Sequence, residues 1–198
     1  MLLRNYDKIC ALSDISHLNS VKLFNEYNVI SSIFPRDTSG TSRQPYSDSS
    51  AMRRPMTTFS NNGNTLTGGT TFYNCNLIVG TSSTPVTYDD YTMSPISASD
   101  IQNVAHSYEL TTDESTGELI STYKKTFTAL TDTTIKEIGV IQGFQTGSNG
   151  YWAVLVYREV LETPINVVAG ANAMITLTKR ISPNSNQPTD YVATASVE

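Results

Sequence analysis

Residues 134–181 contain three strand-like runs in succession: T-I-K-E-I-G-V-I (134–141), Y-W-A-V-L-V-Y-R-E-V-L (151–161) and A-M-I-T-L-T-K-R-I (173–181). β-Branched and aromatic residues, which favour strands, dominate all three runs. Turn-forming residues separate them, with Q-T-G-S-N-G after the first run and residues 163–172 after the second. The pattern predicts a β-meander that forms the core of the protein.

Charged residues predict the register of the first hairpin. Pairing Glu137 with Arg158 also places Lys136 opposite Glu159, so that both cross-strand pairs attract. A slip by one residue in either direction would place two like charges opposite each other. The same register aligns further pairs, namely Ile138 with Tyr157, Val140 with Leu155 and Phe144 with Tyr151. Such charged pairs usually lie on a solvated face and contribute about 0–1 kcal/mol, so we assign Glu137 and Arg158 a structural role.

The composition is that of a single β-rich domain. The chain has 198 residues, enough to bury about 70% of its unfolded surface without help from disulfides. Charged residues make up only 16% of the chain, whereas Ser and Thr, which suit turns and strands, are abundant. The net charge of −5 and the scarcity of Lys/Arg runs argue against nucleic acid as the main partner.

Cys10 and Cys75 are the only cysteines, and we expect both to be reduced and partly buried. Neither belongs to a C-x-x-C pair or has a neighbouring histidine, so we expect no metal and no cofactor. Polar residues 5–8 interrupt the apolar start of the chain, which argues against a secretory signal, and no run has the length of a transmembrane segment. We therefore expect a soluble protein that is made in a cytoplasm and has no membrane partner.

The chain divides into three segments. Residues 1–59 are expected to form an irregular, slightly basic N-terminal arm, since residues 35–55 show neither a strand nor a helix period. Residues 60–182 are expected to form the β domain, with additional strands at 70–79, 86–93, 104–111 and 118–130. Residues 183–198 are expected to be a polar C-terminal tail, extended along a neighbour or disordered. Short strands at this spacing predict an all-β fold, an antiparallel β-sandwich or jelly-roll-like domain.

One of these strands shows strict alternation. Val104, His106, Tyr108 and Leu110 alternate with smaller or polar residues. This pattern predicts a strand with one buried face.

Groups that could support catalysis are sparse. Five carboxylates could supply the pair, about 5–10 Å apart, that glycoside hydrolysis needs, namely Asp89, Asp90, Asp113, Glu114 and Glu137. Acids in such turn-rich positions are ordinarily solvated or cap a turn. His17 and His106 have no nucleophile or ligand cluster beside them, and the glycines within residues 61–70 lack the Lys of a phosphate loop. We therefore expect no enzymatic activity.

Arginine and aromatic side chains are the candidates for an interface. Tyr offers apolar area and a hydroxyl group at small entropic cost, and the chain has 11 Tyr against 6 Phe and 1 Trp. The arginines of the N-terminal arm could dock on an acidic neighbour, whereas packing within the core is the alternative role for the aromatic residues. The candidate interface residues are Arg36, Arg43, Arg53, Arg54, Tyr73, Tyr88, Tyr91, Tyr151 and Trp152.

Five motifs follow one another in order: L-I-V-G-T-S-S-T-P-V-T-Y-D-D-Y (77–91), T-I-K-E-I-G (134–139), V-L-V-Y-R (154–158), P-I-N-V-V-A-G (164–170) and M-I-T-L-T (174–178). This order resembles modules of tailed-bacteriophage virion proteins of the tail-fibre, collar and head-fibre type. In those modules a segment G-T-G-x-T-P-x-x-x-D precedes I-x-E-I-G-L and P-I-x-V-x-A-G. The resemblance covers about half of the chain, from Leu77 to Arg180. Ser82 stands where Gly is usual and Val140 where Leu is usual, and the first sixty residues match nothing in the family.

The resemblance implies a non-enzymatic structural component of a virion, synthesised in the host bacterial cytoplasm and assembled in multiple copies at the head surface, neck or tail. Its partners would be copies of itself and other virion proteins. A receptor- or glycan-binding module of a phage fibre, with a host-surface glycan as partner, is the alternative that an exposed aromatic platform would favour. A glycosidase is a further alternative that would need two facing carboxylates in a cleft.

Overall fold

The computed structural model describes residues 1–17, 34–43, 59, 63–66, 75–146, 150–182 and 188–197, of which 11–17, 144–146, 150–151 and 188–191 are described by their backbone alone. Within these ranges the chain forms a helix followed by strands. Their bounds are α1 (Arg4–His17), β1 (Cys75–Gly80), β2 (Ile101–Thr112), β3 (Leu119–Ala129), β4 (Thr133–Thr146), β5 (Gly150–Val167), β6 (Asn172–Ile181) and β7 (Pro188–Val197).

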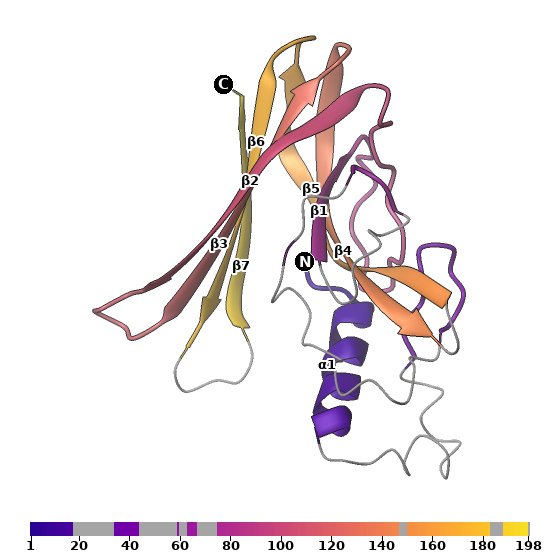
Figure 1. Ribbon diagram of the computed structural model, residues 1–198, viewed down its shortest axis with the longest axis vertical. Coiled ribbons are helices and arrows are strands. Elements are labelled where there is room, and N and C mark those ends of the chain that lie inside the picture. The colour runs from indigo at the N-terminus through magenta and orange to yellow at the C-terminus, as the bar shows by residue number, and fades with distance from the viewer. Residues whose placement is uncertain are drawn as a thin grey trace.

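The strands form two antiparallel sheets that pack face to face. One sheet has the strand order β1-β4-β5 and the other the order β2-β3-β6-β7. Figure 1 shows the sheets as separate layers that lie closest at the top of the view and diverge toward the bottom, where α1 lies. The expected all-β antiparallel sandwich is confirmed.

The three-stranded sheet is covered on both of its faces. All residues of β1 are buried, so this strand lacks the alternation of β3 and β6, whose outer faces meet solvent. Leu77 and Val79 belong to the apolar cluster between the sheets, whereas Ile78 packs in a second cluster with Leu3 and Met93. The start of the chain and the connection from β1 to β2 therefore cover the face of this sheet that the other sheet leaves open.

The predicted register of the β4–β5 hairpin is wrong. Glu137 lies opposite Val160 and Gly139 opposite Arg158, and the pairing shifts at two irregularities along the hairpin. The other predicted pairs change with it, since Ile138 pairs with Glu159, Val140 with Tyr157 and Phe144 with Trp152. Both faces of this sheet are apolar, so packing on the two sides decides the register over the charged pairs. Glu137 and Arg158 nevertheless form an ion pair, on the diagonal of the hairpin and buried instead of solvated.

Two further strand predictions are wrong. β6 pairs with β3 and β7 in the four-stranded sheet, so the three runs that suggested a meander are divided between the sheets. Residues 86–93 form an irregular connection with a turn instead of a strand. Thr87 and Asp90 hold that turn by a backbone hydrogen bond of 3.2 Å.

β2 is a strand, as expected, but its apolar face is not buried. Val104, Tyr108 and Leu110 are 49%, 50% and 52% exposed, and His106 is exposed as well. β2 lies at an edge of its sheet, on the side where the β2–β3 hairpin projects away from the other sheet (Figure 1). Alternation alone gave no information on whether a second layer would reach this face.

Both ends of the chain contribute to the packed fold. Leu3, Tyr6 and Ile9 are buried, and the Leu3 N–H donates to the Val156 carbonyl at 3.1 Å, along the edge of β5. Residues 188–197, expected as part of a polar tail, form β7 and pair with β6, so this expectation is wrong. The predicted boundary at residue 59 stays a prediction, because residues 18–33 and 44–58 lie outside the described ranges.

Candidate functional site

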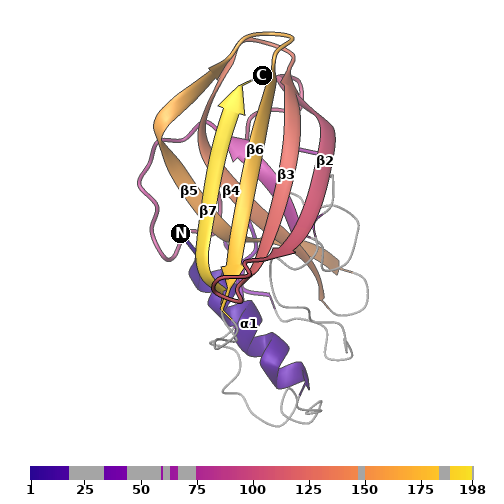
Figure 2. The same cartoon turned by 90° about the vertical axis from the view of Figure 1, so that its left-hand side faces the viewer.

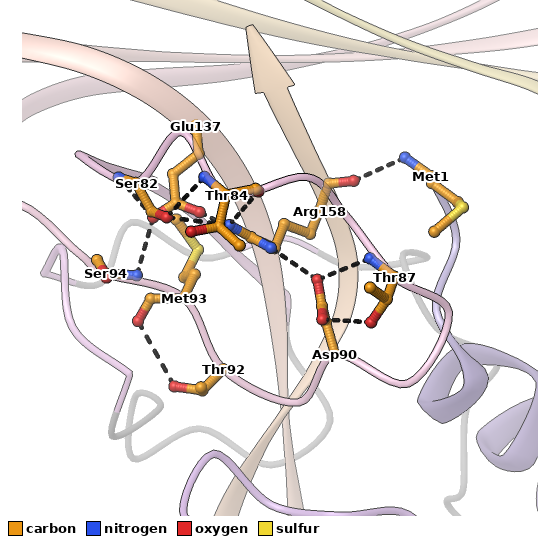
Figure 3. Close-up of polar contacts among 10 residues, drawn as sticks. All are labelled: Met1, Ser82, Thr84, Thr87, Asp90, Thr92, Met93, Ser94, Glu137 and Arg158. Atoms are coloured by element: carbon orange, nitrogen blue, oxygen red, sulfur yellow. Dashed lines mark hydrogen bonds and ion pairs between the residues drawn. The ribbon is translucent and has the colours of Figure 1, made fainter.

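Three of the motif segments meet at a buried ion-pair network (Figure 3). Arg158 on β5 donates from Nε to Glu137 Oε2 on β4 over 2.7 Å and from Nη1 to Asp90 Oδ2 over 2.6 Å. Its Nη2 lies 3.1 Å from the Thr84 carbonyl oxygen and 3.4 Å from the Ser82 hydroxyl. Arg158 therefore ties two strands of the three-stranded sheet to the connection between β1 and β2.

Glu137 is the innermost group of this network. Its side chain is fully buried, and Oε1 accepts backbone N–H bonds from Ser94 at 2.8 Å and from Ser82 at 3.2 Å. With Arg158 on Oε2, the carboxylate has three donors. A side chain at Gly80 would collide with the Ser94 carbonyl oxygen and with Glu137 itself. The glycine of the first motif is thus required by the close approach of the Glu137 carboxylate.

The charges of the network stabilise one another. Burial alone would lower the pKa of Arg158, but its hydrogen bonds to Asp90 and Glu137 raise the pKa above its ordinary value. Burial would likewise raise the pKa of Asp90, but hydrogen bonds from Thr87 and Arg158 outweigh this effect and hold the pKa below its usual range. Thr87 bonds Asp90 through both its hydroxyl, at 2.6 Å, and its backbone N–H, at 3.1 Å. Asp90 is thereby fixed in its ionised form.

The start of the chain lies against the same arginine. The Met1 ammonium group donates to the Arg158 carbonyl oxygen at 2.7 Å, and the Arg158 N–H donates to the Met1 carbonyl oxygen at 3.1 Å. Burial lowers the pKa of this amine, against the opposing effect of Glu159. The backbone at the start of the chain thus pairs with the edge of β5, beside the residue whose side chain forms the network (Figure 3).

Two of the predicted interface arginines contact aromatic rings of the same chain. The Arg43 guanidinium lies 3.3 Å from the centre of the Trp152 ring, and its Nε donates to Asp37 at 2.6 Å. Arg36 lies 5.9 Å from the ring centre of Tyr91. Burial would raise the pKa of Asp37, but hydrogen bonds, including those from Ser39 and Arg43, outweigh it and lower that pKa. Arg43 thus holds residues 34–43 against β5, and Arg36 lies near the connection between β1 and β2.

Among the other predicted interface residues, Tyr88 is the one whose side chain the structure describes. Tyr88 is 42% exposed, its ring centre lies 5.0 Å from the Arg4 guanidinium, and its hydroxyl donates to Asp7. Arg53, Arg54 and Tyr73 lie outside the described residues, and only the backbone of Tyr151 is described. The structure therefore pairs arginines with aromatic residues one by one.

Sequence reasoning missed a buried lysine. Lys125 on β3 is fully buried between the sheets, and its Nζ donates to Asn76 Oδ1 at 2.6 Å and to the Leu77 carbonyl oxygen at 2.9 Å. Burial lowers its pKa to about 7. The available signal was its position, because residues 123, 125 and 127 of a strand share one face, and Tyr123 and Phe127 are both buried there.

The cysteines and the second buried lysine lie in the same interior. Cys10 and Cys75 are reduced and buried, as expected except for the degree of burial, and Cys75 Sγ lies 3.6 Å from Gln142 Oε1. Burial lowers the pKa of Lys179, while Cys75 and Cys10 act in the opposite direction. The space between the sheets thus contains two lysines among mostly apolar side chains.

Across the described ranges, no group of three His, Cys, Asp or Glu side chains is placed to hold a metal ion. No helix among the described residues is both long and apolar enough to cross a membrane. Of the carboxylates that the sequence offered for catalysis, Asp90 and Glu137 both bind Arg158, and Asp89 forms an exposed ion pair with Arg4 at 2.9 Å. Comparison of the chain with protein-family models, with curated proteins and with solved structures found no match.

Proposed function

We propose that this protein is a non-enzymatic structural component of a tailed-phage virion, assembled in multiple copies at the head surface, neck or tail. The order of its motifs, which resembles modules of tail-fibre, collar and head-fibre type, supports the assignment to a virion. The observation that carries the non-enzymatic part is the convergence of the motif residues Gly80, Asp90, Glu137 and Arg158 on one buried network. Buried residues that bind one another stabilise the fold, which is the role that a subunit of a symmetric assembly requires of them.

The same network argues against a glycosidase. A catalytic carboxyl pair must contact the sugar and exchange protons with it or with water. Glu137 is fully buried with three hydrogen-bond donors, and Asp90 is held ionised by Thr87 and Arg158. Both carboxylates are committed to the same guanidinium, so neither is available as a general acid.

The aromatic residues give little support to a sugar-binding platform. Sugar rings stack on the exposed faces of aromatic side chains, and Arg43 covers a face of Trp152 at 3.3 Å. Arg36 lies near the ring of Tyr91 in the same way, at 5.9 Å. A structural role therefore agrees better with the described contacts than a glycan-binding role.

Quantitative mass spectrometry of purified particles of the virus that encodes this chain tests the proposal. We expect the chain in several copies per particle, at a ratio to the major capsid protein that stays constant through purification. Its absence from purified particles would overturn the proposal. Degradation of a host polysaccharide by the purified protein, lost on the surface substitution Asp89→Asn without loss of fold, would instead establish the glycosidase.

A further inference from the structure

Among the described residues, β2 is paired on one side only and forms an edge of its sheet. Within the described part of the chain, β2 pairs with β3 along one side, and Figure 2 shows it at the lateral edge of the four-stranded sheet, opposite β7. Natural edge strands are usually shielded by Lys, Pro, bulges or short length, because their free N–H and C=O groups bind other strands. β2 has twelve residues, no Lys and no Pro, and its pairing with β3 is irregular between Asn103 and Ala105 but regular from Ala105 to Thr112. Such an edge is suited to pairing with another strand.

The side chains of β2 also favour a partner that would bury them. His106, Tyr108 and Leu110 lie opposite Lys125, Tyr123 and Ser121 of β3, and residues that pair directly share a face of the sheet. The three β3 residues are buried, whereas Tyr108 and Leu110 are half exposed. The inner face of the sheet thus continues outward along β2 as an apolar stripe that no described residue buries.

We propose that β2 pairs, antiparallel and edge to edge, with β2 of a second copy of this chain. This inference deepens the proposed function and relies on it for the presence of neighbouring copies. A two-fold axis through Tyr108 places Tyr108 opposite its counterpart and Leu110 opposite His106 of the copy. The two apolar stripes then become continuous across the dimer, and aromatic and apolar cross-strand pairs of this kind stabilise a sheet.

Charge complementarity favours this register over its neighbour at Glu109. With the axis at Tyr108, Glu109 of the copy lies opposite Ser107, and Ser107 lies opposite Lys124 on β3. Strands are about 4.8 Å apart, so Glu109 of the copy and Lys124 have backbones about 10 Å apart with only the small Ser107 between them, a gap that their side chains can span. The pair occurs twice by symmetry. An axis at Glu109 would instead place two carboxylates opposite each other.

The other edge of this sheet is less suited to the same role. β7 packs against β5 of the other sheet, so the sandwich is closed on that side. A chain of copies in which β2 pairs with β7 of the next copy would have to open this contact. Pairing of β2 with itself closes after two copies and leaves β7 in place.

The mass of the purified full-length protein and of two matched variants tests the inference. We expect the wild type to have twice the 21.7 kDa mass of the chain by sedimentation or light scattering. Tyr108→Lys places two ammonium groups together at the axis and should give a monomer. Val192→Lys, a change of a similarly exposed apolar residue on β7, should leave the dimer intact. A monomeric wild type at its highest soluble concentration, or equal behaviour of the two variants, would overturn the inference.

Charge reversal and cross-linking supply a test that does not depend on Tyr108→Lys folding. Lys124→Glu and Glu109→Lys should each weaken the dimer about threefold to tenfold, and the double variant should restore it. Tyr108→Cys should form a disulfide-linked dimer under mild oxidation, whereas Ser196→Cys on β7 should not. Cross-linking through Ser196 or no cross-link at Tyr108 would refute the pairing, while the proposed function would fail separately if the chain were absent from purified particles.

Discussion

Replacement of Arg158 with Met removes the cation from the buried network and keeps much of the apolar length of the side chain. Glu137 would then be a fully buried carboxylate without its cation, retaining the two backbone N–H donors of Ser82 and Ser94. Asp90, whose side chain is 19% exposed, can recover water in place of the guanidinium. The cost should therefore come mainly from Glu137.

Removal of one partner from a buried ion pair destabilises a protein by about 3–5 kcal/mol. The stability of a domain of this size is about 5–15 kcal/mol in total. We therefore expect Arg158→Met to remove a large share of the free energy of unfolding and to lower the urea midpoint accordingly.

Arg180→Met is the matched control for this experiment. Arg180 also lies beside two carboxylates, at 3.4 Å from Glu118 and 3.9 Å from Asp113, but its side chain is 40% exposed. Exposed pairs contribute about 0–1 kcal/mol, so this variant should unfold almost as the wild type does. Urea unfolding followed by the fluorescence of the single Trp gives both values. If Arg158→Met loses no more stability than Arg180→Met, the network does not hold the fold.

Exchange of the charges of Glu137 and Arg158 distinguishes the buried network from the register predicted from the sequence. Pairing across a solvated hairpin predicts that Glu137→Arg combined with Arg158→Glu restores most of the stability. The structure predicts that it does not, because the N–H groups of Ser82 and Ser94 would face a guanidinium and Asp90 would face a carboxylate. Recovery in the double variant would contradict the buried arrangement.

Three other predictions follow from the interior and its glycines. Between pH 7 and 10 the unfolded chain keeps a proton on Lys125 that the folded chain has lost, so the free energy of unfolding should rise by up to about 1.4 kcal/mol per pH unit. Urea unfolding at several pH values measures this rise, and Lys125→Met should flatten it. Gly80→Ala places a methyl group against backbone and Glu137, and should lower the free energy of unfolding in urea by about 1–3 kcal/mol. Gly139→Ala should lower it less, because its methyl group meets the flexible Met93 side chain. The reverse order would contradict the packing. Leu3→Ala should cost about 2–5 kcal/mol in thermal or urea unfolding, since Leu3 is fully buried, and a negligible loss would show that the chain start is not part of the core.

The strands were predictable where local pattern and packing agree. β3 and β6 alternate along their whole length and have one solvated face, so their sequence contains the necessary information. β7 was missed because its residues are mostly small and polar, and it forms a strand through its pairing with β6. Residues 86–93 have the composition of a strand, but Asp90 holds them in a turn through Thr87 and Arg158. Tertiary contacts that link distant segments decide these two cases.

The sequence predicted one contact of the site but not the site itself. Asp90, Glu137 and Arg158 all stand in the quoted motifs, and the attraction between Glu137 and Arg158 was expected from their charges. Their burial was not, because it depends on the chain start and on residues 81–96 covering the second face of the sheet. The residue pattern of β4 and β5 does not predict which segment of the chain covers the second face of their sheet.

The network links motifs that are far apart in the sequence, because it holds the connection between β1 and β2 against β4 and β5. A single long connection, from residue 81 to 100, must be held in place without regular pairing along most of its length. Glu137 supplies acceptors for two of its backbone N–H groups, and Arg158 binds its Asp90 side chain and the Thr84 carbonyl. Two side chains from the sheet thus satisfy polar groups of the connection that would be costly to bury alone. Three of the five motifs therefore form one structural unit, a connection and the two strands that hold it.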